Sequence, residues 1–420
     1  MLWIQRSLSS QSVWLRSPSA RTRPFSFTSN CYAPRVYREI PTFREQIARR
    51  GGVKTFADVV KYPAIRNQIF FFAFGGCVTY FIAAKVANAD TEYWSQRLSE
   101  SGSLVWKLRP PSSDEMRRAR YYELGKKLQT GLATLKDATQ QLPHTLGRVA
   151  VWLYVQIAQP ILDTTEGKRV CWAIGAVNTA VWIAWQFPRF QPFMMRHFTH
   201  SPLSGLSYTM LTCIFSHKSF VHLIFNSMAL ASFGSAATQY MKKEQDKSPH
   251  GLREASVKWH FLAFYISAGL FSSMTSHILM SRIRFPQAVS ELISKRHATS
   301  LSSEAASHAA KKATSEAVLP SLGASGAIYG TVTLTALAFP DTQIALIFPP
   351  TWPIPIQWGV GGLVAMDIIG ALRSWRLFDH YAHLGGAAFG ALYYLYGPKI
   401  WDTCRALDMP VTKASQNSRK

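Results

Sequence analysis

The residues around Ser325 suit a nucleophile at the start of an apolar helix. Ser325 lies in the run Gly-Ala-Ser-Gly-Ala-Ile-Tyr-Gly over residues 323–330, so its neighbours are too small to shield the hydroxyl. The first N–H groups of a helix have no partner within the helix and can stabilise a developing oxyanion. Gly323 allows the backbone to turn sharply before the helix and to approach a ligand closely. These features predict that Ser325 attacks a carbonyl group.

His383 is the candidate base for this serine. A serine hydroxyl is a weak nucleophile until a base removes its proton. His383 lies in the run Ala-His-Leu-Gly-Gly over residues 382–386, near the start of another apolar segment. Ionisable side chains within a membrane are costly and by default indicate function. Ser325 and His383 together therefore predict acyl-transfer chemistry.

Glycine spacing beside both residues predicts that their helices pack closely. Gly326 and Gly330 have the spacing G-x-x-x-G, and so do Gly386 and Gly390. Small residues at this spacing remove side-chain bulk from one helix face, which allows two backbones to approach each other. Such packing would bring the serine and the histidine within hydrogen-bond distance.

A third cluster supplies candidate donors for an oxyanion. His222 and Asn226 are four residues apart, so they lie on one face of a helix. Both side chains can donate hydrogen bonds. The structural alternatives are that serine in such a helix serves packing only, and that the histidine and asparagine satisfy neighbouring carbonyl groups. The occurrence of all three motifs at the starts of apolar segments favours the catalytic interpretation.

Apolar segments of membrane-spanning length surround these motifs. A helix needs about 20 mostly apolar residues to cross a bilayer, with a range of about 17 to 25. The predicted spans are 68–87, 170–187, 219–237, 259–280, 324–339, 356–372 and 380–397. The segment 324–339 is short and polar, so we expect the other helices to surround it. The segment 149–162 is apolar but short and contains Pro160, which indicates an interfacial or packed helix.

The remaining segments are polar or irregular. Residues 39–67 precede the first span, residues 88–169 connect it to the others, and residues 398–420 form a C-terminal tail. Residues 282–322 are predicted to be a flexible loop or a loose surface helix. Four prolines within 341–355 exclude a regular helix there, and the apolar residues among them indicate a segment at the membrane edge.

The N-terminus and the overall composition indicate an address signal and a membrane protein. Residues 1–38 are rich in arginine and serine and contain no acidic residue, which is typical of a transit peptide. A disordered basic arm is the alternative. The net charge of +23 is spread along the 420 residues, and no nucleic-acid-binding motif is present. The five cysteines lack C-x-x-C spacing, so neither a disulfide framework nor a zinc site is expected.

The motifs resemble those of the rhomboid intramembrane proteases. The resemblance covers residues 170–397 and rests on His217-x4-His222-x3-Asn226, Gly323-Ala324-Ser325-Gly326 and Ala382-His383-x2-Gly386. It implies a catalytic dyad of Ser325 and His383 without an aspartate. It also implies that His222, Asn226, Gly323 and the backbone N–H of Ser325 form the oxyanion hole. Tyr329, four residues after the serine, is expected to pack against the catalytic histidine.

The extra span 68–87 and the transit peptide resemble the mitochondrial branch of this family. The resemblance implies an all-α, multi-pass protein of the mitochondrial inner membrane, with a six-helix bundle and one additional N-terminal transmembrane helix. It further implies single-span membrane substrates similar to the mitochondrial dynamin-like fusion GTPase and cytochrome c peroxidase, and neither metal nor organic cofactor. Two departures are the absence of a Trp-Arg pair from 188–202 and the long insertion 282–322.

Two other classes of protein are alternatives to a protease. A non-catalytic rhomboid-like protein would bind or escort transmembrane helices, but such proteins tend to lack the serine or the histidine. A small-solute transporter would be built of related halves with broken helices at mid-membrane, and the sequence contains no such halves.

Overall fold

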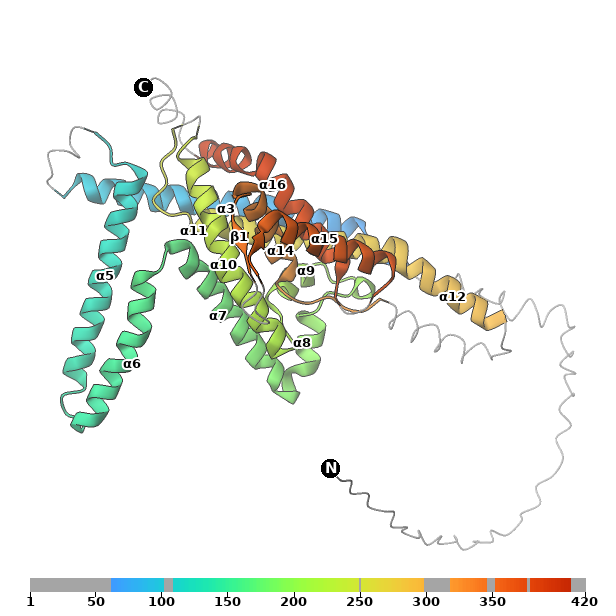
Figure 1. Ribbon diagram of the computed structural model, residues 1–420, viewed down its shortest axis with the longest axis horizontal. Coiled ribbons are helices and arrows are strands. Elements are labelled where there is room, and N and C mark those ends of the chain that lie inside the picture. The colour runs from blue at the N-terminus through green and yellow to red at the C-terminus, as the bar shows by residue number, and fades with distance from the viewer. Residues whose placement is uncertain are drawn as a thin grey trace, which may run out of the picture. The chain divides into compact units, whose positions relative to one another are not determined.

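The computed structural model describes residues 62–101, 109–248, 251–297, 318–345, 352–375 and 378–408. Helices account for nearly all of their regular structure (Figure 1). The two described strands, β1 (Gln343–Ile344) and β2 (Ile354–Pro355), form one short antiparallel pair. The predicted all-α fold class is confirmed. The transit peptide predicted at 1–38 lies outside the described residues.

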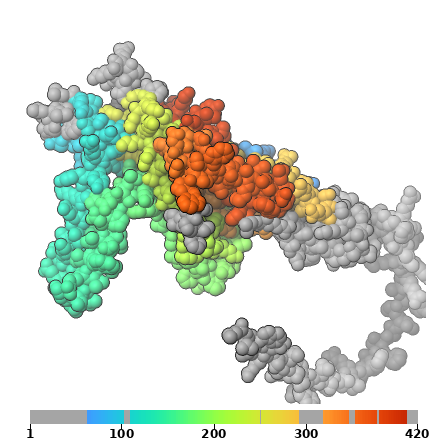
Figure 2. All heavy atoms as spheres, viewed as in Figure 1, coloured from blue at the N-terminus to red at the C-terminus, as the bar shows by residue number. Residues whose placement is uncertain are grey.

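Seven helices form the bundle that contains the predicted motifs. They are α3 (Arg66–Ser99), α7 (Glu166–Gln186), α10 (Phe220–Gln245), α11 (Lys258–Leu279), α14 (Ser325–Ala338), α15 (Ile356–Leu372) and α16 (His380–Leu407). α14 packs against α10, α11, α15 and α16, whereas α3 packs against α11 and α16. In the space-filling view, the C-terminal helices, coloured orange and red, pack without a visible gap on the face shown (Figure 2).

α14 is the central helix of this bundle. Its 14 residues extend about 21 Å at about 1.5 Å per residue, which is less than the thickness of a bilayer core of about 30 Å. Most of its side chains are nevertheless buried, including Ile328 and Leu334. Surrounding helices therefore supply its apolar environment, as its short and polar sequence predicts.

Three described helices have the length and composition of membrane spans: Arg66–Ser99, Phe220–Gln245 and Lys258–Glu291. The segments Glu166–Gln186 and Pro188–His197 have this composition only when taken together, and the chain bends by 98° between them, as in a broken span or a re-entrant loop. Ile356–Leu372 is apolar but shorter. Large apolar side chains such as Phe70, Phe74 and Phe81 are exposed on α3. Such exposure fits a helix whose outer face contacts lipid.

The polar connection 88–169 contains a helical hairpin, α5 (Ser113–Ala138) and α6 (His144–Asp163). α5 begins with a capping box, in which Ser112 accepts from the Glu115 N–H and Glu115 accepts from the Ser112 N–H. The Tyr154 hydroxyl of α6 donates to the Leu128 carbonyl of α5 at 2.8 Å. The apolar segment 149–162 is therefore part of a helix packed on α5.

Short elements complete the described chain. They are η1 (Pro188–Phe190), α8 (Gln191–His197), η2 (Pro202–Ser204), α9 (Thr209–Thr212) and η3 (Cys213–Phe215) between α7 and α10. After α11 the chain continues as the π-helix η4 (Met280–Arg284) and as α12 (Phe285–His297). The first part of the insertion 282–322 is thus helical, and residues 298–317 lie outside the described residues.

Candidate active site

The structure brings Ser325 and His383 into contact. Ser325 is the first residue of α14, and His383 lies in the first turn of α16. The Nε2 atom of His383 is 2.9 Å from the Oγ atom of Ser325. The histidine is buried, with 7% of its surface exposed. The serine hydroxyl can therefore donate to Nε2, provided that the ring proton is on Nδ1.

Asp367 supplies the partner that fixes this tautomer. It is fully buried on α15, and its Oδ1 atom is 3.1 Å from the Nδ1 atom of His383. A carboxylate accepts the Nδ1–H, which leaves Nε2 free to accept from Ser325. The expectation that no aspartate lies at the site is therefore wrong. α15 packs against α16, and this packing brings Asp367 into contact with His383. Asp367 is the one ionisable residue within the apolar segment 356–372.

His380 is a second imidazole on the same carboxylate. Its Nδ1 atom is 2.6 Å from Asp367 Oδ1. A Cβ atom added at Gly370 would lie 2.4 Å from the Cε1 atom of His380, so only glycine gives the ring room there. Among the described residues, Asp367 Oδ2 has no hydrogen-bond partner. Sequence reasoning missed both Asp367 and His380, although an ionisable residue in an apolar segment was the criterion that selected His383.

Aromatic rings hold the imidazole of His383 in place. The Tyr329 ring stacks on it with 4.4 Å between ring centroids and 9° between the planes. Tyr329 follows Ser325 by about one helical turn, so both face α16. Phe378 lies 6.0 Å from the His383 ring. These contacts restrict rotation of the base away from the serine.

The close approach of α14 and α16 depends on the predicted glycines. A Cβ atom at Gly386 would lie 2.0 Å from the carbonyl oxygen of Gly326, and one at Gly390 would lie 2.3 Å from that of Gly330. Side chains do not fit at these distances. On the other side of Gly326, the Ser272 hydroxyl of α11 donates to the Ala382 carbonyl at 2.7 Å. Three helices are thereby joined next to the serine and the histidine.

His222 lies against the backbone that precedes Ser325. Gly323 has a φ of +131°, a region that favours glycine. A Cβ atom at this position would also lie 2.7 Å from the Cε1 atom of His222. The close contact and the backbone conformation both require glycine here. The His222 ring thus lies beside the first turn of α14, as an oxyanion donor must.

Asn226 reaches the same backbone through another residue. Its Nδ2 atom donates to His217 Nε2 at 3.0 Å, and the backbone N–H of Ala324 donates to the same nitrogen at 3.4 Å. The rings of His217 and His222 meet edge to face at 5.0 Å. His217 belongs to the motif on which the resemblance rests, but the sequence predicted no role for it. The structure places it between Asn226 and the start of α14.

The described residues contain no group of three or more His, Cys, Asp or Glu side chains arranged to hold a metal ion. The groups that the structure brings together at this site are a serine, imidazoles, a carboxylate and the backbone at the start of α14.

Comparison with known proteins gives the family. Residues 205–399 match the rhomboid domain. The chain contains a rhomboid domain. The chain is 31% identical over 241 residues to the presenilin-associated rhomboid-like protein, mitochondrial, of Homo sapiens. The aligned region covers 57% of this chain and 51% of that relative. It is 26% identical over 235 residues to rhomboid protein 1, mitochondrial, of Saccharomyces cerevisiae. The aligned region covers 55% of this chain and 54% of that relative. These names support the mitochondrial branch.

The chain spans about half the length of the curated relatives it matches. No solved structure matches this chain. The matched segment includes Ser325, His383, Asp367, His222 and Asn226. It begins after α8, so the helix α3, the hairpin α5–α6 and the helix α7 lie outside it.

Proposed function

We propose that this protein is an intramembrane serine protease. The observation that carries the proposal is the 2.9 Å contact between Ser325 Oγ and His383 Nε2. Ser325 Oγ attacks the substrate carbonyl carbon as His383 Nε2 takes the hydroxyl proton. The carbon–nitrogen bond then breaks, and Nε2 returns the proton to the leaving amine. Water hydrolyses the acyl-enzyme by the same proton transfers and releases the serine.

Asp367 acts through His383 as a positioning residue. Its carboxylate accepts the Nδ1–H and stabilises the imidazolium that forms when Nε2 takes the proton. The proposed catalytic unit is thus a Ser–His–Asp triad rather than a dyad. His380 holds the same carboxylate oxygen from the other side and limits its movement.

The oxyanion forms at the start of α14. We assign its stabilisation to the backbone N–H of Ser325 and to the His222 imidazole, which lies against Gly323. Asn226 acts as a positioning residue through His217, whose Nε2 atom accepts from both the Asn226 amide and the Ala324 N–H and so holds the start of α14. Donors of this kind act where charge develops in the transition state.

The substrates in this proposal are single-span proteins of the mitochondrial inner membrane. The names of both relatives place those relatives in mitochondria, and several apolar helices of this chain have the length of spans. A transmembrane segment must unwind locally to present its peptide bond, because a regular helix hides its carbonyl groups in hydrogen bonds. The dynamin-like fusion GTPase and cytochrome c peroxidase of the resemblance belong to this substrate class.

One experiment separates the protease from a non-catalytic protein that binds transmembrane helices. The full chain is reconstituted in lipid vesicles with a fluorescent single-span substrate and compared with Ser325→Ala. We expect cleavage by the wild-type protein only, together with labelling of Ser325 by a fluorophosphonate. Substrate binding without cleavage or labelling would favour the escort function and overturn the proposal.

A further inference from the structure

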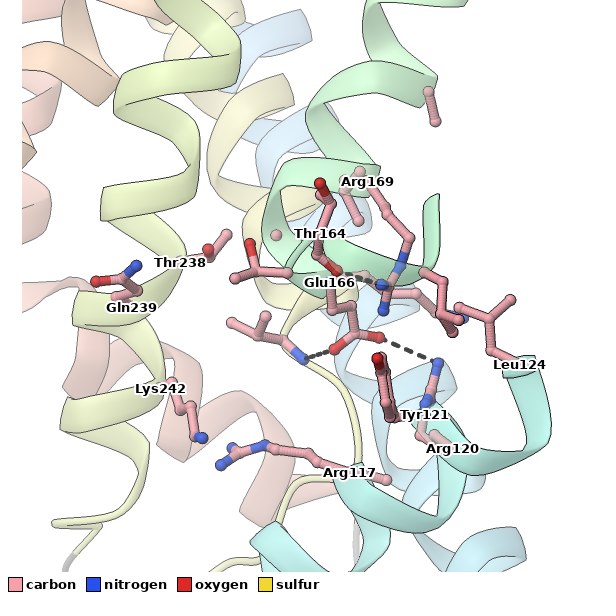
Figure 3. A pocket seen from close by; sticks show the side chains of 18 of the residues that line it. Arg117, Arg120, Tyr121, Leu124, Thr164, Glu166, Arg169, Thr238, Gln239 and Lys242 are labelled. Carbon is pink, nitrogen blue, oxygen red and sulfur yellow. Dashed lines mark hydrogen bonds and ion pairs between the residues drawn. The ribbon is translucent and has the colours of Figure 1, made fainter. Parts of the chain in front are cut away.

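A cavity of about 700 Å³ lies between α5, the start of α7 and the end of α10 (Figure 3). Its walls come from α5, from the link between α6 and α7, from the end of α10 and from the start of α11. Lys242 on its wall lies about 30 Å from His222 along α10, at about 1.5 Å per residue. The cavity is therefore separate from the candidate active site.

Positive charge predominates in the lining of this cavity. The lining carries the carboxylates of Asp163 and Glu166, and its five cationic side chains are Arg117, Arg120, Arg169, Lys242 and Lys258. Glu166 is already held by Arg120 at 3.1 Å and by the Ser256 hydroxyl at 2.7 Å. Asp163 accepts from the Gln159 amide. Within the lining, cations therefore outnumber carboxylates by five to two. Carboxylates outside the lining also pair with some of them: Asp90 with Arg120, and Asp114 with Arg117 and Lys242.

Several of these cations retain unused binding capacity. The Arg169 guanidinium donates to the carbonyl oxygens of Ile161 and Thr164, and within the described ranges no carboxylate is at ion-pair distance from Arg169. Arg117 is 13% exposed, and its Nε and Nη2 atoms have no hydrogen-bond partner among the described residues. Buried N–H groups without a partner are costly unless an anion accepts from them.

Arg117 and Lys242 converge on one point from two helices. Figure 3 shows Arg117 from α5 and Lys242 from α10 pointing toward each other. Both contact the same oxygen of Asp114, at 3.4 Å and 3.0 Å. Arg117 also lies 3.5 Å from an oxygen of Asp246. Asp114 and Asp246 are both exposed to solvent, where ion pairs are weak, so a phosphate can compete with them for the two cations.

The surroundings of the cavity favour a lipid over a free anion. The cavity lies where α7 begins and α10 ends, which is the level of the lipid headgroups for spanning helices. Apolar side chains, including Leu124, Leu162 and Val170, share the lining with the cations. On the adjoining α6, one face carries exposed apolar side chains at helical spacing: Val149, Trp152, Leu153 and Ile157. Acyl chains can lie along such a face.

We propose that this cavity binds the headgroup phosphate of an anionic phospholipid. Arg117, Lys242 and Arg169 donate to the phosphate oxygens, and the acyl chains follow the apolar side chains of α6 and α7. Basic pockets between spanning helices commonly recognise such headgroups. The bound lipid joins the α5–α6 hairpin to α7 and α10.

The test is lipid-dependent thermal unfolding of the full chain, purified in detergent and freed of lipid. Phosphatidylglycerol, phosphatidylcholine and inorganic phosphate are titrated separately. We expect a saturable rise in Tm with phosphatidylglycerol only. Lys242→Gln and Arg117→Gln should each weaken the apparent affinity about fivefold, the contribution typical of one basic side chain at a membrane surface. The matched control is Lys243→Gln, an exposed neighbour outside the lining, which should bind as the wild type does.

Three outcomes would overturn the proposal. Equal effects of phosphatidylcholine and phosphatidylglycerol would mean that charge is not recognised. An equal rise with inorganic phosphate would identify a free-anion site instead. An unchanged apparent affinity of Lys242→Gln for phosphatidylglycerol would show that the lipid does not bind in this cavity. Should Arg117→Gln fail to fold, the comparison of Lys242 with Lys243 still decides, because Lys242 is 43% exposed and its replacement uncovers no buried charge.

Discussion

At the residue scale, the site is a chain of contacts from Asp367 through His383 to Ser325. Each link has hydrogen-bond length, 3.1 Å and 2.9 Å. Residues linked in this way act as a unit, so the loss of one member removes most of the benefit of the others. This property gives three predictions that separate catalytic, positioning and structural roles.

Ser325→Ala and His383→Ala should each reduce kcat by at least about 10⁴-fold, because either change removes the nucleophile–base pair. The double variant should be no slower than either single variant. Turnover of the single-span substrate in vesicles measures this effect, with the inserted protein quantified in the same sample. Wild-type turnover by either single variant would contradict the assignment.

Asp367→Asn should lower kcat by about 10²- to 10⁴-fold with little change in KM. The amide no longer fixes the proton on Nδ1 of His383 and no longer stabilises the imidazolium by its charge. The matched control is His380→Gln, which alters a group on the same carboxylate oxygen that does not contact Ser325. We expect less than about a tenfold loss there. Equal losses in the two variants would indicate that Asp367 only maintains the packing of α15 on α16.

His222→Ala should lower kcat by about 10²- to 10³-fold, the usual effect of removing one oxyanion donor. Asn226→Ala should cost less and should match His217→Ala, because the amide acts through that imidazole. Kinetics of the folded fraction, paired with a melting curve, measure both effects. A larger kcat loss in Asn226→Ala than in His217→Ala would show that the amide itself contacts the oxyanion.

At the element scale, two helices carry the reaction because glycines allow them to touch. The carbonyl oxygens of Gly326 and Gly330 occupy the positions where side chains of Gly386 and Gly390 would lie. α11 adds the Ser272 hydrogen bond to the start of α16. The distance between nucleophile and base is therefore set by backbone contact rather than by flexible side chains.

Gly390→Leu should separate α14 from α16 and lower both Tm and activity, since overpacking in a dense core costs about 1–3 kcal/mol or more. The control is Gly361→Leu on α15, where a Cβ atom meets nothing within 4 Å. That variant should melt and turn over substrate like the wild type. Full activity in Gly390→Leu would show that activity does not depend on close packing of α14 against α16.

At the scale of the whole molecule, a buried carboxylate occupies the end of the bundle opposite the serine. Glu254, between α10 and α11, has no exposed surface. Burial raises the pKa of this carboxyl from the ordinary 4.5 to about 7, and nearby Glu166 adds to the increase. Arg405 and Arg117 oppose it, and so does the Trp401 indole. The charged form is disfavoured in the folded protein up to about neutral pH.

This raised pKa makes stability depend on pH. Between pH 4.5 and 7 the unfolded chain has lost the Glu254 proton while the folded protein retains it. The unfolded state then binds fewer protons, so the free energy of unfolding falls as pH rises through this window, by about 3 kcal/mol at most, and becomes constant above pH 7. Glu254→Gln removes this contribution.

The Tm of Glu254→Gln should therefore increase relative to wild type from pH 5 to pH 8. Glu244→Gln is the control, because Glu244 lies near the end of α10 and pairs with Lys247 at the surface. Its Tm should follow that of the wild type. Parallel curves for Glu254→Gln and wild type across this range would exclude Glu254 as the titrating group.

The sequence by itself determined the features that depend on neighbouring residues. The apolar segments, the small residues around Ser325, and the helix faces of His222, Asn226, Gly386 and Gly390 follow from composition and spacing along one helix. The length and polarity of 324–339 also indicated a helix surrounded by others. The structure places His222 beside Gly323 and packs Gly386 and Gly390 against α14, since local periodicity fixes which face of a helix a side chain occupies. Asn226 reaches the same region only through His217.

Only the tertiary structure decided which elements meet. Asp367 reaches His383 because α15 ends beside the first turn of α16, and His217 lies between Asn226 and Ala324 because α10 packs on α14. The cavity lined by Arg117 and Lys242 likewise joins residues of α5 and α10 that are distant in the sequence. Spacing along one chain segment does not set the direction or depth at which another helix crosses it. These contacts therefore follow from the packing of whole helices, which the sum of all their side-chain interactions determines.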